Sequence, residues 1–301
     1  MSEAPQLQAR SVTDIIDAAF SLYRRNFALF AGVVAVLGVP QTLITMLVAA
    51  VTPHPAPILP AGSGPSSRYF TEYLSTAATS SAASGADGLI GVLFGAIITL
   101  ALARAIAARY LGEPVTVLGA YRSLGFRPVG RLILAGIFAV VAGGLALAIL
   151  IGVGILVIVV LNQVALAAAV IFGIVYFLAL FALIIYVSIS VVFLPQVIAL
   201  AGGGPVRSFP RSWLLIRGYW WRVFGCVLLL SLITSILTGI VGTILIFAIA
   251  FGSPVLAAAI SGVVGILLQP IQLTGMTLLY FDQRIRKEGF DLELALAANP
   301  V

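Results

Sequence analysis

The sequence predicts an all-α, polytopic membrane protein with six transmembrane helices paired into three hairpins. Hydrophobic residues make up 61% of the chain and charged residues 9%, whereas charged residues account for about 25% of an ordinary soluble domain. Six apolar stretches each reach the length of about 20 residues that a helix needs to cross the hydrocarbon layer of a membrane. A cluster of arginines stands before and after each pair of stretches, and this pattern indicates the topology of the chain across the membrane.

The spans are expected at 27–51, 88–109, 132–161, 163–195, 223–250 and 254–281. Together they should form a single membrane domain that covers residues 1–301. Asn162 and Gln163 are the only polar interruption between the third and fourth spans. This short break predicts a tight helical hairpin.

Two segments should lie outside the membrane. Residues 52–87 should form the one long outer loop, which opens with a proline-rich stretch that favours irregular chain and continues with a short interfacial helix near 68–74. The loop is either a plain connector or a partner-binding segment. After the last span, residues 282–301 should form a cytoplasmic tail, in which the acidic residues are expected to be solvated.

Fifteen of the sixteen basic residues fall on one side of the predicted membrane. Because short loops rich in arginine and lysine stay in the cytoplasm, this side and both termini should be cytoplasmic. The location expected is therefore the bacterial plasma membrane. The same pattern explains the net charge of +6 without nucleic-acid binding. Only Arg68 lies on the other side, and the rest are Arg10, Arg24, Arg25, Arg104, Arg109, Arg122, Arg127, Arg131, Arg207, Arg211, Arg217, Arg222, Arg284, Arg286 and Lys287.

The arginine clusters also reveal an internal repeat. A shift of about 91 residues places Gly112, Pro114 and Leu124 on residues of the same type farther along the chain. Such matches fall where a cytoplasmic segment leads into a pair of spans. We predict three units, each an amphipathic cytoplasmic segment followed by a hairpin, at 10–109, 112–200 and 203–281.

The amphipathic segments should lie along the inner leaflet. In residues 12–27, apolar side chains recur on one helical stripe, and Ser11 with Asp14 has the spacing of a capping box. In the third unit, tryptophans stand beside arginines, a combination typical of headgroup depth. The predicted contacts with anionic lipid are Arg24, Arg25, Arg127, Arg131, Trp213, Arg217, Trp220, Trp221 and Arg222. The alternative is that these residues only orient and anchor the protein.

Proline stands beside glutamine in three of the predicted spans. Proline frees a backbone carbonyl inside a helix, which an amide side chain can then satisfy. Broken helices with polar side chains are also how transporters build sites at the membrane centre. The two hypotheses are a local kink and a shared polar cavity, the latter formed by Gln41, Gln196, Gln269 and Gln272.

The sequence offers little material for catalysis. The predicted spans contain no Asp, Glu or Lys, which argues against a proton-driven carrier. Cys226 and His54 are each the only residue of their type, so no disulfide framework or metal cluster is expected. Neither a catalytic group nor a cofactor site is predicted, and the protein is expected not to be an enzyme.

Both ends of the chain carry a family resemblance. The run from Leu278 to Leu294, with Tyr280-Phe281-Asp282 within it, resembles the end of the membrane domain of glycerophosphoryl diester phosphodiesterase and related six-span proteins, and residues 14–27 resemble the opening of that group. In that family the phosphodiesterase chemistry belongs to a separate soluble barrel. The resemblance therefore implies the membrane module alone, with no catalytic residue to carry over.

Three functions remain as hypotheses. The first is a non-enzymatic scaffold or accessory module that contacts inner-leaflet lipid, a membrane-protein partner or a second copy of itself. The second is a permease or channel for a small uncharged or lipid-like solute, lined by the Pro/Gln positions. The third, a lipid-acting enzyme, requires the acidic tail residues to face lipid headgroups.

Overall fold

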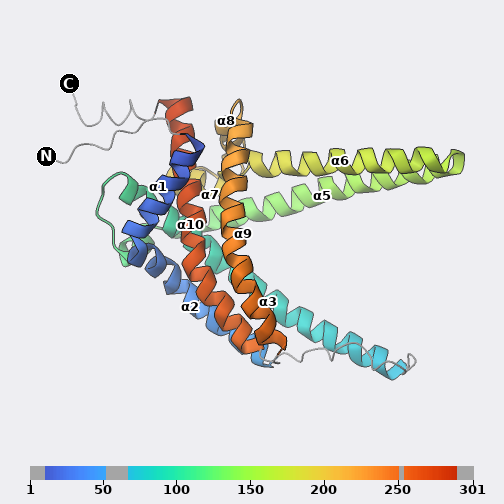
Figure 1. The fold of residues 1–301 in the computed structure, drawn as a ribbon, viewed down its shortest axis with the longest axis horizontal. Coiled ribbons are helices and arrows are strands. Elements are labelled where there is room, and N and C mark those ends of the chain that lie inside the picture. Colours follow the sequence, from blue (N-terminus) through green and yellow to red (C-terminus); the bar gives the residue numbers. More distant parts are fainter. Residues whose placement is uncertain (1–10, 52–66, 251–253, 290–301) are drawn as a thin grey trace.

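The structure is a computed structural model that describes residues 11–51, 67–250 and 254–289, and within these ranges the regular elements are ten α-helices (Figure 1). Six of the helical segments are long and apolar enough to cross a membrane. The predicted all-α, six-span fold is thereby confirmed. The helices are α1 (Val12–Arg25), α2 (Phe27–Val51), α3 (Ser67–Tyr110), α4 (Val117–Arg122), α5 (Phe126–Val164), α6 (Leu166–Ser190), α7 (Leu194–Leu200), α8 (Ser208–Ile216), α9 (Trp220–Ala250) and α10 (Pro254–Glu288).

The structure corrects two predicted boundaries. The chain from Ser67 to Asp87, expected to be outer loop, is the first half of the 44-residue helix α3. Its alanines are the strongest helix formers, so the helix continues beyond the apolar stretch. Residues 52–66 lie outside the described part. At the other end α10 runs to Glu288, so the residues from 282 onwards begin as helix and not as a tail.

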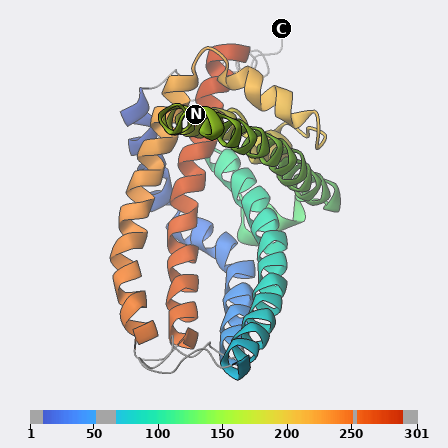
Figure 2. The ribbon, with the colours of Figure 1, turned by 90° about the vertical axis from the view of Figure 1, so that its right-hand side faces the viewer.

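Helices α2, α3, α9 and α10 form a bundle in which α10 packs against α2 and α9, while α2 also packs against α3 (Figures 1 and 2). A short helix precedes each pair of spans, namely α1, α4 and α8. This order is the one that the predicted repeat requires, although the repeat itself stays a prediction. We call the end of the bundle that carries α1, α7 and α8 the Arg-rich end.

The α5–α6 hairpin projects away from the bundle, and Figure 2 views it nearly end-on. Inside the hairpin, the Tyr176 hydroxyl donates to the Leu150 carbonyl at 2.6 Å. Gly154 makes room for that ring, since an added Cβ would lie 2.8 Å from Tyr176 Cδ1. The predicted hairpin is confirmed, with its turn at Ala165. In the most apolar part of each of its two helices only 6% of the residues are buried within the protein. Lipid or a partner must therefore cover the hairpin.

Helix α1 shows how the sequence builds the Arg-rich end. The predicted capping box is present: Asp14 N donates to Ser11 Oγ at 3.1 Å, and Ser11 N donates to Asp14 Oδ2 at 3.0 Å. Ile15 and Ala19 are fully buried against the spans, whereas Arg24 is exposed. The short helix therefore lies with its apolar side on the bundle.

The packed core lies toward the Arg-rich end. One cluster joins Phe30 of α2 and Leu102 of α3 to Leu124, and a second joins Phe193 and Tyr280 to α1 and α8. Arg104 ties the layers together, because its Nε donates to the Ala199 carbonyl at 3.1 Å and its Nη1 donates to the Ser123 carbonyl. An arginine in a predicted span thus caps backbone carbonyls of neighbouring segments.

Two tyrosines fasten the short helices to the spans. Tyr23 of α1 donates to the Leu267 carbonyl of α10 at 2.8 Å, and Tyr121 of α4 donates to the Val33 carbonyl of α2. Burial raises the pKa of Tyr121 to about 12. The hydroxyl therefore keeps its proton, and remains a donor, even at a pH where an exposed tyrosine would ionise.

Candidate functional site

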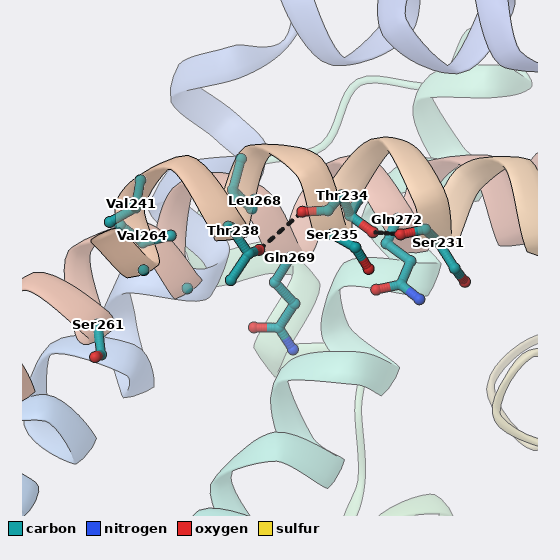
Figure 3. A pocket seen from close by; sticks show the side chains of 13 residues that line it. Ser231, Thr234, Ser235, Thr238, Val241, Ser261, Val264, Leu268, Gln269 and Gln272 are labelled. Carbon is teal, nitrogen blue, oxygen red and sulfur yellow. Dashed lines mark hydrogen bonds between the residues drawn. The ribbon is translucent and has the colours of Figure 1, made fainter. Parts of the chain in front are cut away.

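A groove of about 800 Å³ opens between α9 and α10, away from the packed core (Figure 3). Its polar side chains are hydroxyls on α9 and a hydroxyl with two carboxamides on α10, and small residues leave the space between them. The lining residues are Ser231, Thr234, Ser235, Thr238, Gly239, Val241, Gly242, Ser261, Val264, Gly265, Leu268, Gln269 and Gln272.

The hydroxyls of α9 share one helical face. Ser231, Thr234, Ser235 and Thr238 are spaced by three and four residues, which places them on one stripe. Thr234 donates to the Leu230 carbonyl at 3.0 Å, and Thr238 donates to the Thr234 carbonyl at 2.8 Å. Since the protons of Thr234 and Thr238 are already committed to the helix backbone, these two hydroxyl oxygens can serve a ligand in the groove mainly as acceptors.

Gln269 and Gln272 project from α10 into the same groove (Figure 3). Neither carboxamide has a hydrogen-bond partner among the residues that the structure describes. Each offers two N–H donors and one carbonyl acceptor. The groove is therefore uncharged and largely apolar, with a few polar groups that include unused donors.

The groove ends toward the Arg-rich end. Leu230 and Met276, which are almost fully buried, pack there with Ile16 of α1. Leu230 directly precedes the first hydroxyl of the stripe, and Met276 lies one turn beyond Gln272. The groove is consequently open at its side and closed at this end.

Gln41, the third predicted cavity residue, lies elsewhere. Its Nε2 donates to Asp87 Oδ1 at 3.0 Å, and Thr45 Oγ1 donates to the same carboxylate. The cluster joins α2 to α3 and is not part of the groove lining. Sequence reasoning missed Asp87 because the residue lies just before the predicted second span. The second span begins at Asp87, so the prediction that the spans contain no acidic residue is wrong at this position.

Gln196 is also separate from the groove. The chain turns at residues 191–193, between α6 and α7, and Gln196 on α7 is only 1% exposed. Its Oε1 is buried without a partner among the described residues. The structure therefore brings Gln269 and Gln272 together and places Gln41 and Gln196 in two other environments.

The predicted lipid contacts divide into two sets. Trp213 and Trp221 are 38% and 77% exposed, and the Arg217 guanidinium lies 5.1 Å from the ring centre of Trp213. We call Trp213, Arg217 and Trp221 the Trp–Arg surface. Trp220 is less exposed and stacks on Tyr186. The remaining exposed residues of this set are Arg24, Arg25 and Arg127.

The second set is engaged within the protein. Arg222 pairs with Asp282 at 3.0 Å, and Arg286 pairs with the same carboxylate at 3.0 Å. Arg131 Nη1 donates to the Gly202 carbonyl at 2.8 Å. Asp282 is only 3% exposed, so its expected solvation is wrong. The Arg222–Asp282 pair joins α9 to the end of α10, whereas Arg286 binds the same carboxylate from within α10. Such pairing offsets the cost of burying the charge.

Glu288 bridges in a similar way nearer the surface. It pairs with Arg211 of α8 at 3.2 Å and with Arg284 at 2.8 Å. The other two acidic tail residues, Asp291 and Glu293, lie outside the described part of the chain. Among the described residues no group of three or more His, Cys, Asp or Glu side chains is placed to hold a metal ion.

These observations define a multi-pass α-helical membrane protein with a packed arginine-rich end and a polar groove between two spans. Residues 11–283 match the model of a family described as Domain of unknown function (DUF7847), and the chain belongs to this family. No curated protein matches the sequence, and no solved structure does. The resemblance to the phosphodiesterase membrane domain is not tested by this match and stays a prediction.

Proposed function

We propose that the protein is a non-enzymatic scaffold module of the bacterial plasma membrane that contacts anionic lipid of the inner leaflet. The observation that carries this proposal is the Trp–Arg surface, in which the exposed indole ring of Trp213 lies beside the exposed Arg217 guanidinium and Trp221 is exposed at the start of α9. Indole rings favour headgroup depth, and basic residues attract anionic lipid there. Arg24, Arg25 and Arg127 add exposed positive charge at other points of the chain.

Lipid quenching of tryptophan fluorescence tests this proposal. All three tryptophans lie between residues 213 and 221, so the emission of the protein comes from the segment that carries the Trp–Arg surface. In proteoliposomes, brominated phosphatidylglycerol should quench more strongly than brominated phosphatidylcholine. Arg217→Gln should lower the preference for the anionic lipid about fivefold, because one basic residue near the surface contributes about 1 kcal/mol.

The control is Arg68→Gln, which removes a basic residue predicted to lie on the opposite side of the membrane. It should leave the preference unchanged, since the charge lies beyond the range of the inner leaflet potential. Equal quenching of the unaltered protein by the two lipids would refute the proposal. So would an equal effect of the two substitutions.

The groove favours the second hypothesis, transport of an uncharged solute, more than any other feature does. Its end at Leu230 and Met276 instead supports the scaffold. Osmotic swelling of proteoliposomes in small uncharged solutes separates the two functions. If the protein is a scaffold, proteoliposomes should swell at the same rate as protein-free liposomes. If it is a permease or channel, they should swell faster.

A further inference from the structure

We propose that the groove between α9 and α10 binds an uncharged membrane lipid whose head carries hydroxyl and ester groups, as a diacylglycerol does. This site is separate from the Trp–Arg surface, and only its depth rests on the headgroup position proposed above for the tryptophans. The proposal rests on the depth of the groove, the chemistry of its lining and the direction of its opening.

The depth follows from helix geometry. Ser231 lies 231 − 220 = 11 residues beyond Trp220, or about 16 Å along the axis of α9, and Thr238 lies about 27 Å along it. With Trp220 near the headgroups, both hydroxyls fall within a hydrocarbon layer of about 30 Å. An unpaired carboxamide at such a depth costs several kcal/mol. Gln269 and Gln272 therefore favour an occupant that can accept and donate hydrogen bonds.

The lining selects against a charged headgroup. None of the residues around the groove is charged, so a phosphate would be buried there without a counter-ion, which is strongly unfavourable. The Gln269 and Gln272 amides can donate to ester carbonyls. The hydroxyl oxygens of Thr234 and Thr238 can accept from a lipid hydroxyl, because their own protons bind the helix backbone. These donors and acceptors match the ester carbonyls and the free hydroxyl of a diacylglycerol head.

The volume and the opening agree with a lipid that enters from the side. About 800 Å³ lies within the usual range of ligand sites, enough for a glycerol head with the upper part of its acyl chains. Ser235, Ser261 and Gln272 are exposed at the rim. Since Leu230 and Met276 close the inner end, the acyl chains must leave through the lateral opening into the surrounding lipid.

Photo-crosslinking in nanodiscs tests the site. A diacylglycerol with a diazirine near the carbonyl end of one acyl chain would be compared with phosphatidylglycerol that carries the same modified chain. After irradiation, mass spectrometry should locate the diacylglycerol label on peptides of α9 and α10 about tenfold more often than the phospholipid label, a ratio that corresponds to about 1.4 kcal/mol.

Two glycine substitutions provide a matched pair. Gly242→Leu fills the groove without a clash, since nothing lies within 4 Å of an added Cβ. Gly143→Leu adds the same side chain on α5, also into open space and outside the groove lining. Gly242→Leu should lower diacylglycerol labelling of α9 and α10 about tenfold, whereas Gly143→Leu should leave it unchanged. Gel filtration of both variants confirms that they fold.

The outcomes separate clearly. Equal labelling by the two lipids would overturn the proposal, as would labelling that Gly242→Leu leaves unchanged. Disulfide-linked dimers of a Thr238→Cys variant in nanodiscs would show a second copy on the groove and would also overturn it. The tryptophan-quenching result does not bear on any of these outcomes.

Discussion

Asp282→Asn should lower the free energy of unfolding by about 3 kcal/mol, because removal of one partner from a buried ion pair leaves the other charges uncompensated. The carboxylate is 3% exposed and binds both Arg222 and Arg286 at 3.0 Å. Unfolding in mild detergent, followed by far-ultraviolet circular dichroism against added denaturing detergent, measures the loss.

Glu288→Gln is the matched control for this prediction. Glu288 also pairs with two arginines, but its side chain is 29% exposed, and exposed pairs contribute at most about 1 kcal/mol. A double-mutant cycle of Asp282→Asn with Arg222→Gln should give a coupling energy of about 1 kcal/mol or more. If the two single carboxylate variants lose the same stability, Asp282 does not hold α9 to α10 as described.

Gly262→Ala should also destabilise the protein, by about 1–3 kcal/mol, although alanine is the better helix former. Gly262 lies where α10 packs closely against Thr42 of α2. An added Cβ would lie 2.7 Å from Thr42 Cβ, and a Cβ cannot rotate away as the end of a long side chain can. The helices must therefore separate. Thermal unfolding of the detergent-solubilised protein measures the effect.

Gly265→Ala, one turn along α10, provides the control. Nothing lies within 4 Å of the added Cβ there, so the substitution should be neutral or slightly stabilising. The double variant Gly262→Ala with Thr42→Gly should recover part of the loss, because it moves the side chain from α2 to α10. A Gly262→Ala protein as stable as the parent would contradict the close packing of α2 and α10.

The spans were predictable because their signal is local. Runs of about 20 apolar residues need no tertiary information, and the first span, 27–51, coincides with α2. The extension of α3 back to Ser67 was not predictable in this way, because its first half lacks the hydropathy of a span. The break between α6 and α7 at residues 191–193 was missed because the apolar stretch continues across it from Leu166 to Leu200.

The candidate site was only partly predictable, because residues of the same Pro/Gln motif need not lie in the same part of the folded protein. Gln269 and Gln272 are three residues apart on one helix, and that spacing puts them on one face. Gln41 and Gln196 lie on other helices. Only tertiary packing determines that Gln41 binds Asp87 and that Gln196 is buried in the core. The Ser/Thr stripe from Ser231 to Thr238 was present in the sequence and could have been found by its helical spacing.

Cysteine labelling from the two sides of the membrane tests the central claim, a six-span module whose Arg-rich end faces the cytoplasm. Thr13→Cys, Gly85→Cys and Asn162→Cys each introduce an exposed position, and the native Cys226 is buried. In intact cells a membrane-impermeant maleimide should label the cysteines at 85 and 162, while the one at 13 should react only in inside-out vesicles. Labelling of position 13 in intact cells, or of position 85 or 162 only in inside-out vesicles, would contradict the account.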